Sequence, residues 1–246
     1  MRSYLSFEAT RQFRNRDALI WRLGLPAGVY LILTVTSQQT SGHDVANSVL
    51  IGRMVAMAAF GAVSAGLFAT GPLLAQERAT GWLSHLRTTP MPPIAAVAAK
   101  VVVAMAYALP SIALVAALGA IITDIALGWG RWLELVGLMW IGTAPIAALG
   151  VLIGLAIADT EAANTATNFA FIVLWLLGGI LTDPSNMPAA MAAVTRTLPS
   201  YGLIQLGDAA AYSTSPSVSA PIVLAAWTAG AGVLAAVAWR RLGRAR

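Results

Sequence analysis

The chain has 246 residues, of which 58% are hydrophobic and only 10% are charged, and its formal net charge is +5. Ordinary soluble domains carry about 25% charged residues. The apolar residues also occur in runs of about 20, the length with which a helix crosses a hydrocarbon core of about 30 Å. The composition therefore excludes an ordinary soluble domain and predicts an all-α, multi-pass membrane protein in which residues 1–246 form a single transmembrane domain.

Cysteine is absent, which excludes disulfides, thiolate nucleophiles and thiolate metal ligands. The positive charge comes almost entirely from arginines that are spread over the predicted loops and both ends of the chain. This distribution favours loops that face the cytoplasm over a nucleic-acid-binding surface. We therefore expect a lipid bilayer and no nucleic acid as a partner.

The first two predicted spans occupy residues 18–75, after a charged and aromatic segment at 1–17. In that segment Leu5, Ala9 and Phe13 recur every four residues, which favours an interfacial helix, although a solvated N-terminus is the alternative. We expect the first span at about 18–37 and the second at about 48–75. The second is longer than the bilayer core, so it should tilt or project into water.

The stretch 76–100, QERATGWLSHLRTTPMPPIAAVAAK, is the longest polar interruption between two strongly apolar runs, and residues 76–92 are its predicted loop. Glu77 and Arg78 open it, and Trp82, Leu83 and Leu86 lie on one side of a short amphipathic turn. The turn should end at Thr89-Pro90, because proline lacks a backbone donor and restricts the residue before it. We predict a small helix at the membrane surface, in position to contact another protein.

Residues 93–181 are expected to hold spans three to five, at about 94–122, 133–158 and 165–181. Residues 182–216 contain four prolines and short helical pieces, which predicts re-entrant or interfacial helices before the last span. The sixth span and a tail rich in arginine fill residues 217–246.

The basic residues are distributed very unevenly between the two sides of such a six-span chain. One side would carry Arg2, Arg11, Arg14, Arg16, Arg22, Arg78, Arg87, Lys100, Arg240, Arg241, Arg244 and Arg246. The other side would carry Arg53, Arg131 and Arg196. Because positive loops stay in the cytoplasm, both termini and residues 76–92 are predicted to be cytoplasmic, and residues 182–216 to be on the outer side.

No catalytic constellation is evident. Lys100 is the only lysine and lies in AAAKVVV, so a Walker A loop, which ends in Gly-Lys-Ser/Thr, cannot be formed. His43 and His85 are predicted on opposite sides of the membrane and cannot share a metal or a catalytic triad. We expect no enzyme activity, cofactor or metal on this chain.

Polar residues at span edges are candidate pathway or dimer-interface residues, because they are costly in a bilayer. Arg53 either extends to the outer headgroups or lines a substrate path. Asn164 and Asn168 share one helix face, and either cap the helix and bond a neighbouring span or polarise a translocation cavity. Lys100 is expected to extend to the inner headgroups.

The stretch 76–100 resembles the membrane subunits of ABC-2 type transporters. Their pattern is matched, at every spacing, by Glu77-Arg78, Gly81, Leu86, Thr89-Pro90 and Lys100. The outer region adds Pro184, Met187-Pro188, Leu198-Pro199 and Tyr201. Two features depart from the family: Trp82 stands where a small polar residue is common, and the loop after the first span is short.

This resemblance implies a permease subunit of an ATP-driven exporter in the cell membrane, with no motor of its own. Residues 76–92 would hold the coupling helix, which would dock into a groove on a separate ATPase subunit. The complex would contain two copies of this ATPase, which would bind ATP and Mg. The implied ATPase-coupling residues are Glu77, Arg78, Gly81, Trp82, Leu83, Leu86, Thr89 and Pro90. A second permease subunit, identical or paralogous, would complete the pathway.

The expected substrate is a small hydrophobic or amphiphilic compound, such as a drug or antibiotic, so the chain would contribute to efflux and antibiotic resistance. Lipid or glycan export by the same family is the alternative within the class. Outside it, the alternatives are an ion-driven transporter and a non-transporting membrane scaffold.

Overall fold

The computed structural model describes residues 16–41, 47–81, 93–123, 125 and 127–241, and every regular element in them is a helix. In chain order these elements are α2 (Arg16–Ser41), α3 (Asn47–Phe68), α4 (Gly71–Ala79), α6 (Pro93–Ile122), α7 (Trp129–Gly142), α8 (Ala144–Ala156), α9 (Thr160–Leu176), the 3-10 helix η2 (Pro184–Asn186), α10 (Ala189–Thr197), α11 (Pro199–Tyr212) and α12 (Ser219–Arg241). The all-α prediction is confirmed for these residues. The predicted interfacial helix at 1–17 lies outside them, apart from Arg16 and Asp17 in α2, and so do residues 82–92 of the stretch 76–92 that is predicted to hold the coupling helix.

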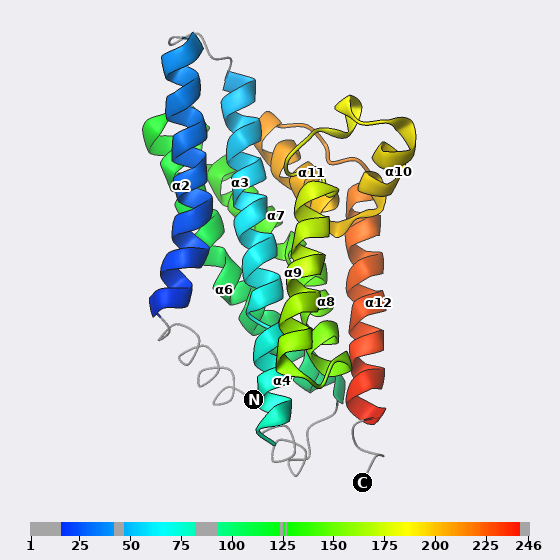
Figure 1. Ribbon diagram of the computed structural model, residues 1–246. Coiled ribbons are helices and arrows are strands. Elements are labelled where there is room, and N and C mark those ends of the chain that lie inside the picture. Colours follow the sequence, from blue (N-terminus) through cyan, green and yellow to red (C-terminus); the bar gives the residue numbers. More distant parts are fainter. Residues whose placement is uncertain (1–15, 42–46, 82–92, 124, 126, 242–246) are drawn as a thin grey trace.

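The long helices lie side by side as a bundle (Figure 1). At the lower end of the view α4 and α12 end and α6 and α9 begin, and we call this the α4 end. At the upper end lie η2, α10 and α11, and we call this the α10 end. The segments on either side of residues 82–92 therefore both belong to the α4 end.

Four stretches of the described chain are long and apolar enough to cross a membrane: Asn47–Ala79, Ile94–Ile122, Trp129–Ala156 and Ser219–Arg241. They correspond to the predicted spans two, three, four and six. The apolar part of α2, Leu23–Ser37, is shorter, and α9 has 17 residues. Large apolar side chains such as Ile32, Ile121 and Leu133 point outward and are more than half exposed, as expected for a surface in contact with lipid.

Helix α3 is the centre of the bundle and packs against α2, α6, α8, α11 and α9. Its glycines bring neighbouring helices close. A Cβ on Gly61 would lie 2.1 Å from the Ser111 hydroxyl in α6, and a Cβ on Gly66 would lie 3.1 Å from Ile146 in α8. These small residues therefore permit close contacts between the helices.

The second predicted span is longer than expected and is interrupted. Helix α3 ends at Phe68, and α4 starts at Gly71-Pro72, because proline lacks the backbone donor that would continue the hydrogen-bond ladder. The Thr70 hydroxyl donates to the Gly66 carbonyl at 2.9 Å and so satisfies an acceptor at the break. The helical path then continues to Ala79, four residues into the stretch predicted to be a loop.

The predicted limits of the fifth span, 165–181, are wrong by about one turn. The predicted spans four and five leave residues 159–164 as a loop between them, but the Asp159 side chain accepts a hydrogen bond from the Ala162 amide at 2.8 Å and caps α9. The helix therefore starts at Thr160. It ends at Leu176, before Gly179 with φ +82°.

The proline-rich segment 182–216 folds as the expected short helices. Pro184 and Pro199 lie at the first positions of η2 and α11, and Pro188 precedes α10, where a missing backbone donor costs nothing. The segment is fixed to the bundle by the Tyr212 hydroxyl, which donates to the Ser48 carbonyl at 2.7 Å, and by the Ser200 hydroxyl, which donates to the Leu174 carbonyl at 3.0 Å.

Candidate functional site

The last turn of α4 leads directly into residues 82–92, and its sequence explains why it stops there. The Thr80 hydroxyl donates to the Gln76 carbonyl at 3.1 Å and to the Glu77 carbonyl at 3.2 Å. Gly81 follows with φ +76°, and its amide donates to the Arg78 carbonyl at 3.1 Å. A left-handed residue after a helix favours glycine. Gly81 of the predicted coupling motif therefore ends the helix and redirects the chain.

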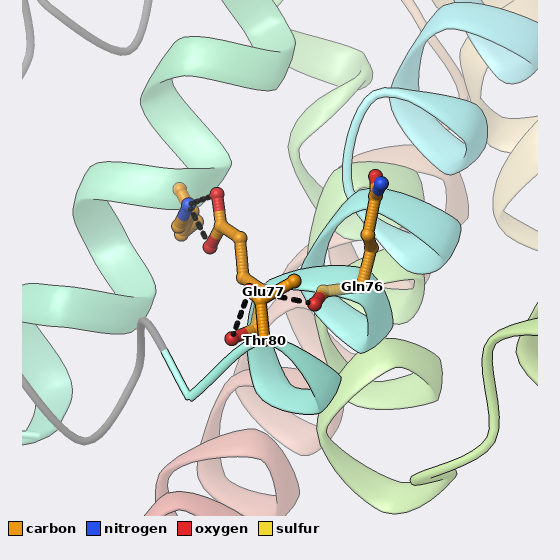
Figure 2. A network of polar contacts seen from close by, with 4 residues as sticks. Gln76, Glu77 and Thr80 are labelled. Carbon is orange, nitrogen blue, oxygen red and sulfur yellow. Dashed lines mark hydrogen bonds and ion pairs between the residues drawn. The ribbon is translucent and has the colours of Figure 1, made fainter.

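Glu77 and Lys100 form a buried ion pair between α4 and α6 (Figure 2). The lysine Nζ lies 2.7 Å from Oε2 and 3.0 Å from Oε1 of the glutamate. Glu77 is 1% exposed and Lys100 is 4% exposed. The expectation that Lys100 extends to the headgroups is wrong, because its ammonium group binds the Glu77 carboxylate inside the bundle.

The pair is the main electrostatic feature of the α4 end. Within the part of the chain whose side chains are described, Glu77 and Lys100 are the only acidic or basic residues that are buried. A buried charge without a partner is strongly unfavourable, so removal of either side chain leaves the other uncompensated. The ion pair thus joins α4, which precedes residues 82–92, to α6, which follows them. Each charged side chain compensates the buried charge of the other.

Arg78, the neighbour of Glu77, connects α4 to a third helix. Its guanidinium donates to the Leu155 carbonyl at 2.8 Å. Leu155 lies in the last turn of α8, where carbonyl groups lack partners within the helix and a cation is favourable. The side chain of Arg78 thereby stabilises the end of α8.

The backbones of α4 and α8 also approach closely beside this contact. A Cβ on Gly154 would lie 2.5 Å from the Gly71 carbonyl oxygen and 2.8 Å from Leu74 Cβ. Leu74 and Leu155 belong to an apolar cluster with Val97 of α6 and Trp239 of α12. The ion pair, the Arg78 hydrogen bond and this packing together form what we call the α4 joint, which connects α4, α6 and α8.

The other residues predicted to couple to an ATPase, Trp82, Leu83, Leu86, Thr89 and Pro90, lie outside the described residues. The structure therefore brings together Glu77 and Lys100 and positions Arg78 and Gly81. Their proposed roles toward an ATPase stay predictions.

The three candidate pathway residues do not meet at one place. Arg53 donates to the Leu33 carbonyl of α2 at 3.0 Å, close to the α10 end. Asn168 donates to the Asn164 carbonyl at 2.9 Å, and both asparagines are exposed on α9. The pair of asparagines bonds along its own helix, rather than to a neighbouring one, and presents polar groups on an outward face.

A second polar site, which the sequence did not indicate, lies at the α10 end. A cavity of about 220 Å³ is lined by residues of α11 and the loops around it, among them Asp183, Tyr201, Gln205 and Asp208. Burial raises the pKa of Asp208 to about 6, and the negative charge of Asp183 adds to this rise. Hydrogen bonds from Ser185 lower the pKa of Asp183.

Among the described residues, no three His, Asp or Glu side chains come close enough to hold a metal ion. A signal for the α4 joint did exist in the sequence: a lone lysine within an apolar run needs a counter-charge, and Glu77 is predicted at the same end of the bundle.

Comparisons with known proteins identify the family of the chain. The model of the family "ABC-2 type transporter" matches residues 2–206. The chain is also similar to "Putative transport permease YvfS" of Bacillus subtilis (strain 168), with 31% identity over 196 residues, which cover 79% of this chain and 78% of that protein. The family match covers the chain from α2 to α10, including the α4 joint, and ends within α11, before α12. The chain belongs to the ABC-2 type transporter family and is a multi-pass transport permease subunit.

Proposed function

We propose that this chain is the membrane-spanning permease of an ATP-driven exporter, coupled through residues 76–92 to a separate ATPase. The observation that carries the proposal is the Glu77–Lys100 pair, because it joins the segment that enters residues 82–92 to the segment that leaves it. A push on those residues by a docked ATPase would reach α4 and α6 together, and α8 through Arg78.

The proposed topology has six spans. It adds α2 and α9 to the four stretches that are long and apolar enough to cross, with the α4 end in the cytoplasm. The excess of basic residues predicted for that side supports this orientation. Helices η2, α10 and α11 then form the outer re-entrant region, and both ends of the chain are cytoplasmic.

In this proposal two permease subunits, identical or paralogous, form the pathway, and two ATPase copies supply ATP and Mg. ATP can do work on the pathway only if the two states of the permease dock the ATPase differently. The exposed polar face of Asn164 and Asn168 is a candidate for the pathway or the dimer interface. A small hydrophobic or amphiphilic compound is the proposed cargo.

Purification from native membranes in mild detergent tests the proposal. We expect a P-loop ATPase to co-purify in near-equal amount, and ATP turnover of the complex to change when the cargo is added. Recovery of the permease without any ATPase would contradict the proposal.

An ion-driven transporter is the second candidate, and Asp208 is the observation that favours it. A carboxyl group whose pKa lies near 6 can exchange a proton between neutral and mildly acidic solution. Transport by the purified chain on a proton gradient, without an ATPase, would establish this alternative and displace the first.

A further inference from the structure

A membrane-facing groove runs between α6 and α12. It has a volume of about 450 Å³, and its lining is almost entirely apolar, with Val97 and Val101 from α6 and Gly232 and Ala236 from α12. Thr228, the first residue of α12 that lines the groove, adds little polarity because its hydroxyl donates to the Leu224 carbonyl at 2.7 Å. The groove is therefore suited to a hydrocarbon chain.

A single charged residue, Arg240, lines the other end of the groove. Its side chain is exposed, and it forms no ion pair with the described residues. The basic residue of α6, Lys100, is already paired with Glu77. The groove thus combines an apolar channel with one available positive charge at its α4 end.

The length of the groove matches one leaflet. Thr228 and Arg240 are twelve residues apart on α12, which corresponds to about 18 Å along a helix. Half of a hydrocarbon core is about 15 Å. An acyl chain that starts beside Arg240 would therefore end near Thr228.

We propose that this groove binds one anionic phospholipid of the leaflet at the α4 end, with an acyl chain between α6 and α12 and its phosphate beside Arg240. In the orientation proposed above, this is the inner leaflet. A juxtamembrane arginine contributes to the binding of an acidic headgroup, and so favours an anionic lipid over a zwitterionic one.

A second copy of the chain fits this groove less well. Two identical subunits related by an axis along the membrane normal have the same residues at the same depth. Packing of α12 against its own copy would then bring one Arg240 close to the other, and like charges repel. An anionic headgroup instead neutralises the charge.

The occupant would also affect the α4 joint. The face of α12 that carries Ala235 and Trp239 packs against Leu74 and Leu155, which belong to the joint. A lipid in the groove therefore holds α12 and α6 together beside the contacts of α4. We expect the anionic lipid to raise the melting temperature of the purified chain.

The test uses the full chain in neutral detergent with added phosphatidylglycerol or phosphatidylcholine of the same acyl composition, and bound lipid is counted by native mass spectrometry. We expect the wild type to prefer phosphatidylglycerol, and Arg240→Gln to reduce that preference about fivefold. Arg241→Gln is the matched control, because Arg241 does not line the groove.

A second pair of variants tests the apolar part. A Cβ at Gly232 or at Gly230 meets nothing within 4 Å, so Gly232→Leu should fill the α6–α12 groove without a clash. Gly230→Leu instead projects into a separate apolar depression between α8 and α12. We expect Gly232→Leu to lose bound phosphatidylglycerol and Gly230→Leu to keep it.

Three results would overturn the proposal. The first is an unchanged lipid preference in Arg240→Gln, and the second is equal loss of lipid in Gly230→Leu and Gly232→Leu. The third is a change from dimer to monomer in Gly232→Leu without any loss of lipid, because it would identify the groove as a contact between two copies of the chain.

Discussion

Each end of the bundle holds a carboxyl group that is shielded from water, but within the described chain only the one at the α4 end is paired with a positive charge. At the α4 end, Glu77 is buried and lies 2.7 Å from the ammonium of Lys100. At the α10 end, Asp208 lines a cavity, and it forms no hydrogen bond or ion pair with the described residues. Its pKa rises to about 6, because burial disfavours its charged form.

This difference indicates two kinds of function. A paired, buried charge fixes the geometry of the helices that carry it, because separation of the partners is costly. An unpaired carboxyl in a cavity leaves its hydrogen-bonding capacity open to water, a proton or a ligand. We therefore interpret the α4 end as a mechanical joint and the α10 end as an adaptable polar surface.

The largest effect is expected when the buried pair is broken. Lys100→Met leaves Glu77 buried without a counter-charge, which should lower the free energy of unfolding by about 3–5 kcal/mol. Chemical unfolding in detergent measures the change. The double variant Glu77→Gln/Lys100→Met should recover most of the loss, and Glu161→Gln, at an exposed site on α9, should change little. Equal stability of Lys100→Met and the wild type would contradict the claim that the buried ion pair stabilises the α4 joint.

Asp208 should make stability depend on pH. Because its pKa is raised from 3.8 to about 6 in the folded state, the folded chain binds more protons than the unfolded chain between these pH values. The free energy of unfolding should therefore fall as the pH rises from about 4 to about 6, by about 2 kcal/mol. In Asp208→Asn this slope should disappear, and the variant should be more stable than the wild type at pH 7.

Asp183→Asn is the control for that series. Burial is the larger cause of the Asp208 shift and Asp183 the smaller one, so most of the slope should persist in this variant. A wild-type stability that stays flat from pH 4 to pH 6 would show that Asp208 is not shielded from water.

The close approach of α4 and α8 gives a smaller expected effect. Gly154→Ala places a Cβ 2.5 Å from the Gly71 carbonyl oxygen, which belongs to the backbone and cannot rotate away. Overpacking of this kind costs about 1–3 kcal/mol. Gly137→Ala, where nothing lies within 4 Å of the new Cβ, should instead stabilise α7 slightly, since alanine favours a helix. Equal changes in melting temperature for Gly154→Ala and Gly137→Ala would argue against the close contact between α4 and α8.

Substitution of Arg78 should give the smallest loss of stability among these variants. Arg78→Gln removes the hydrogen bond to the Leu155 carbonyl, and we expect about 1 kcal/mol of lost stability because the side chain is only partly buried. Arg131→Gln at the opposite end is the control. Hydrogen exchange at the last turn of α8 should accelerate in Arg78→Gln alone, and unchanged protection there would contradict the contact.

The parts of the fold that could be predicted are those that depend on residues close together in the sequence. Runs of apolar residues and prolines gave the long helices and the broken segment 182–216, since these signals act within a few residues. The interruption at Thr70 and the cap at Asp159 were missed, because each depends on one side chain that bonds a nearby backbone group.

The candidate site was only partly predictable for a different reason. Glu77, Gly81 and Lys100 were indicated by their resemblance to the family pattern, but the contact of Glu77 with Lys100 joins residues 23 positions apart. Such a contact depends on how α4 and α6 pack, and helical periodicity does not report this. Asp208 looked ordinary in the sequence, because its raised pKa arises from burial by distant segments.

The central claim is that residues 76–92 dock an ATPase, and a single cysteine can test it because the natural chain has none. We would introduce it by Ser84→Cys, because Ser84 lies in this stretch but is not one of the implied coupling residues. Ser215→Cys, in an exposed loop at the α10 end, is the control. A short photo-cross-linker would be attached to each cysteine in native membrane vesicles. We predict that the cysteine at position 84 captures a P-loop ATPase and that the one at position 215 does not. Capture from position 215, or none from position 84, would contradict the account.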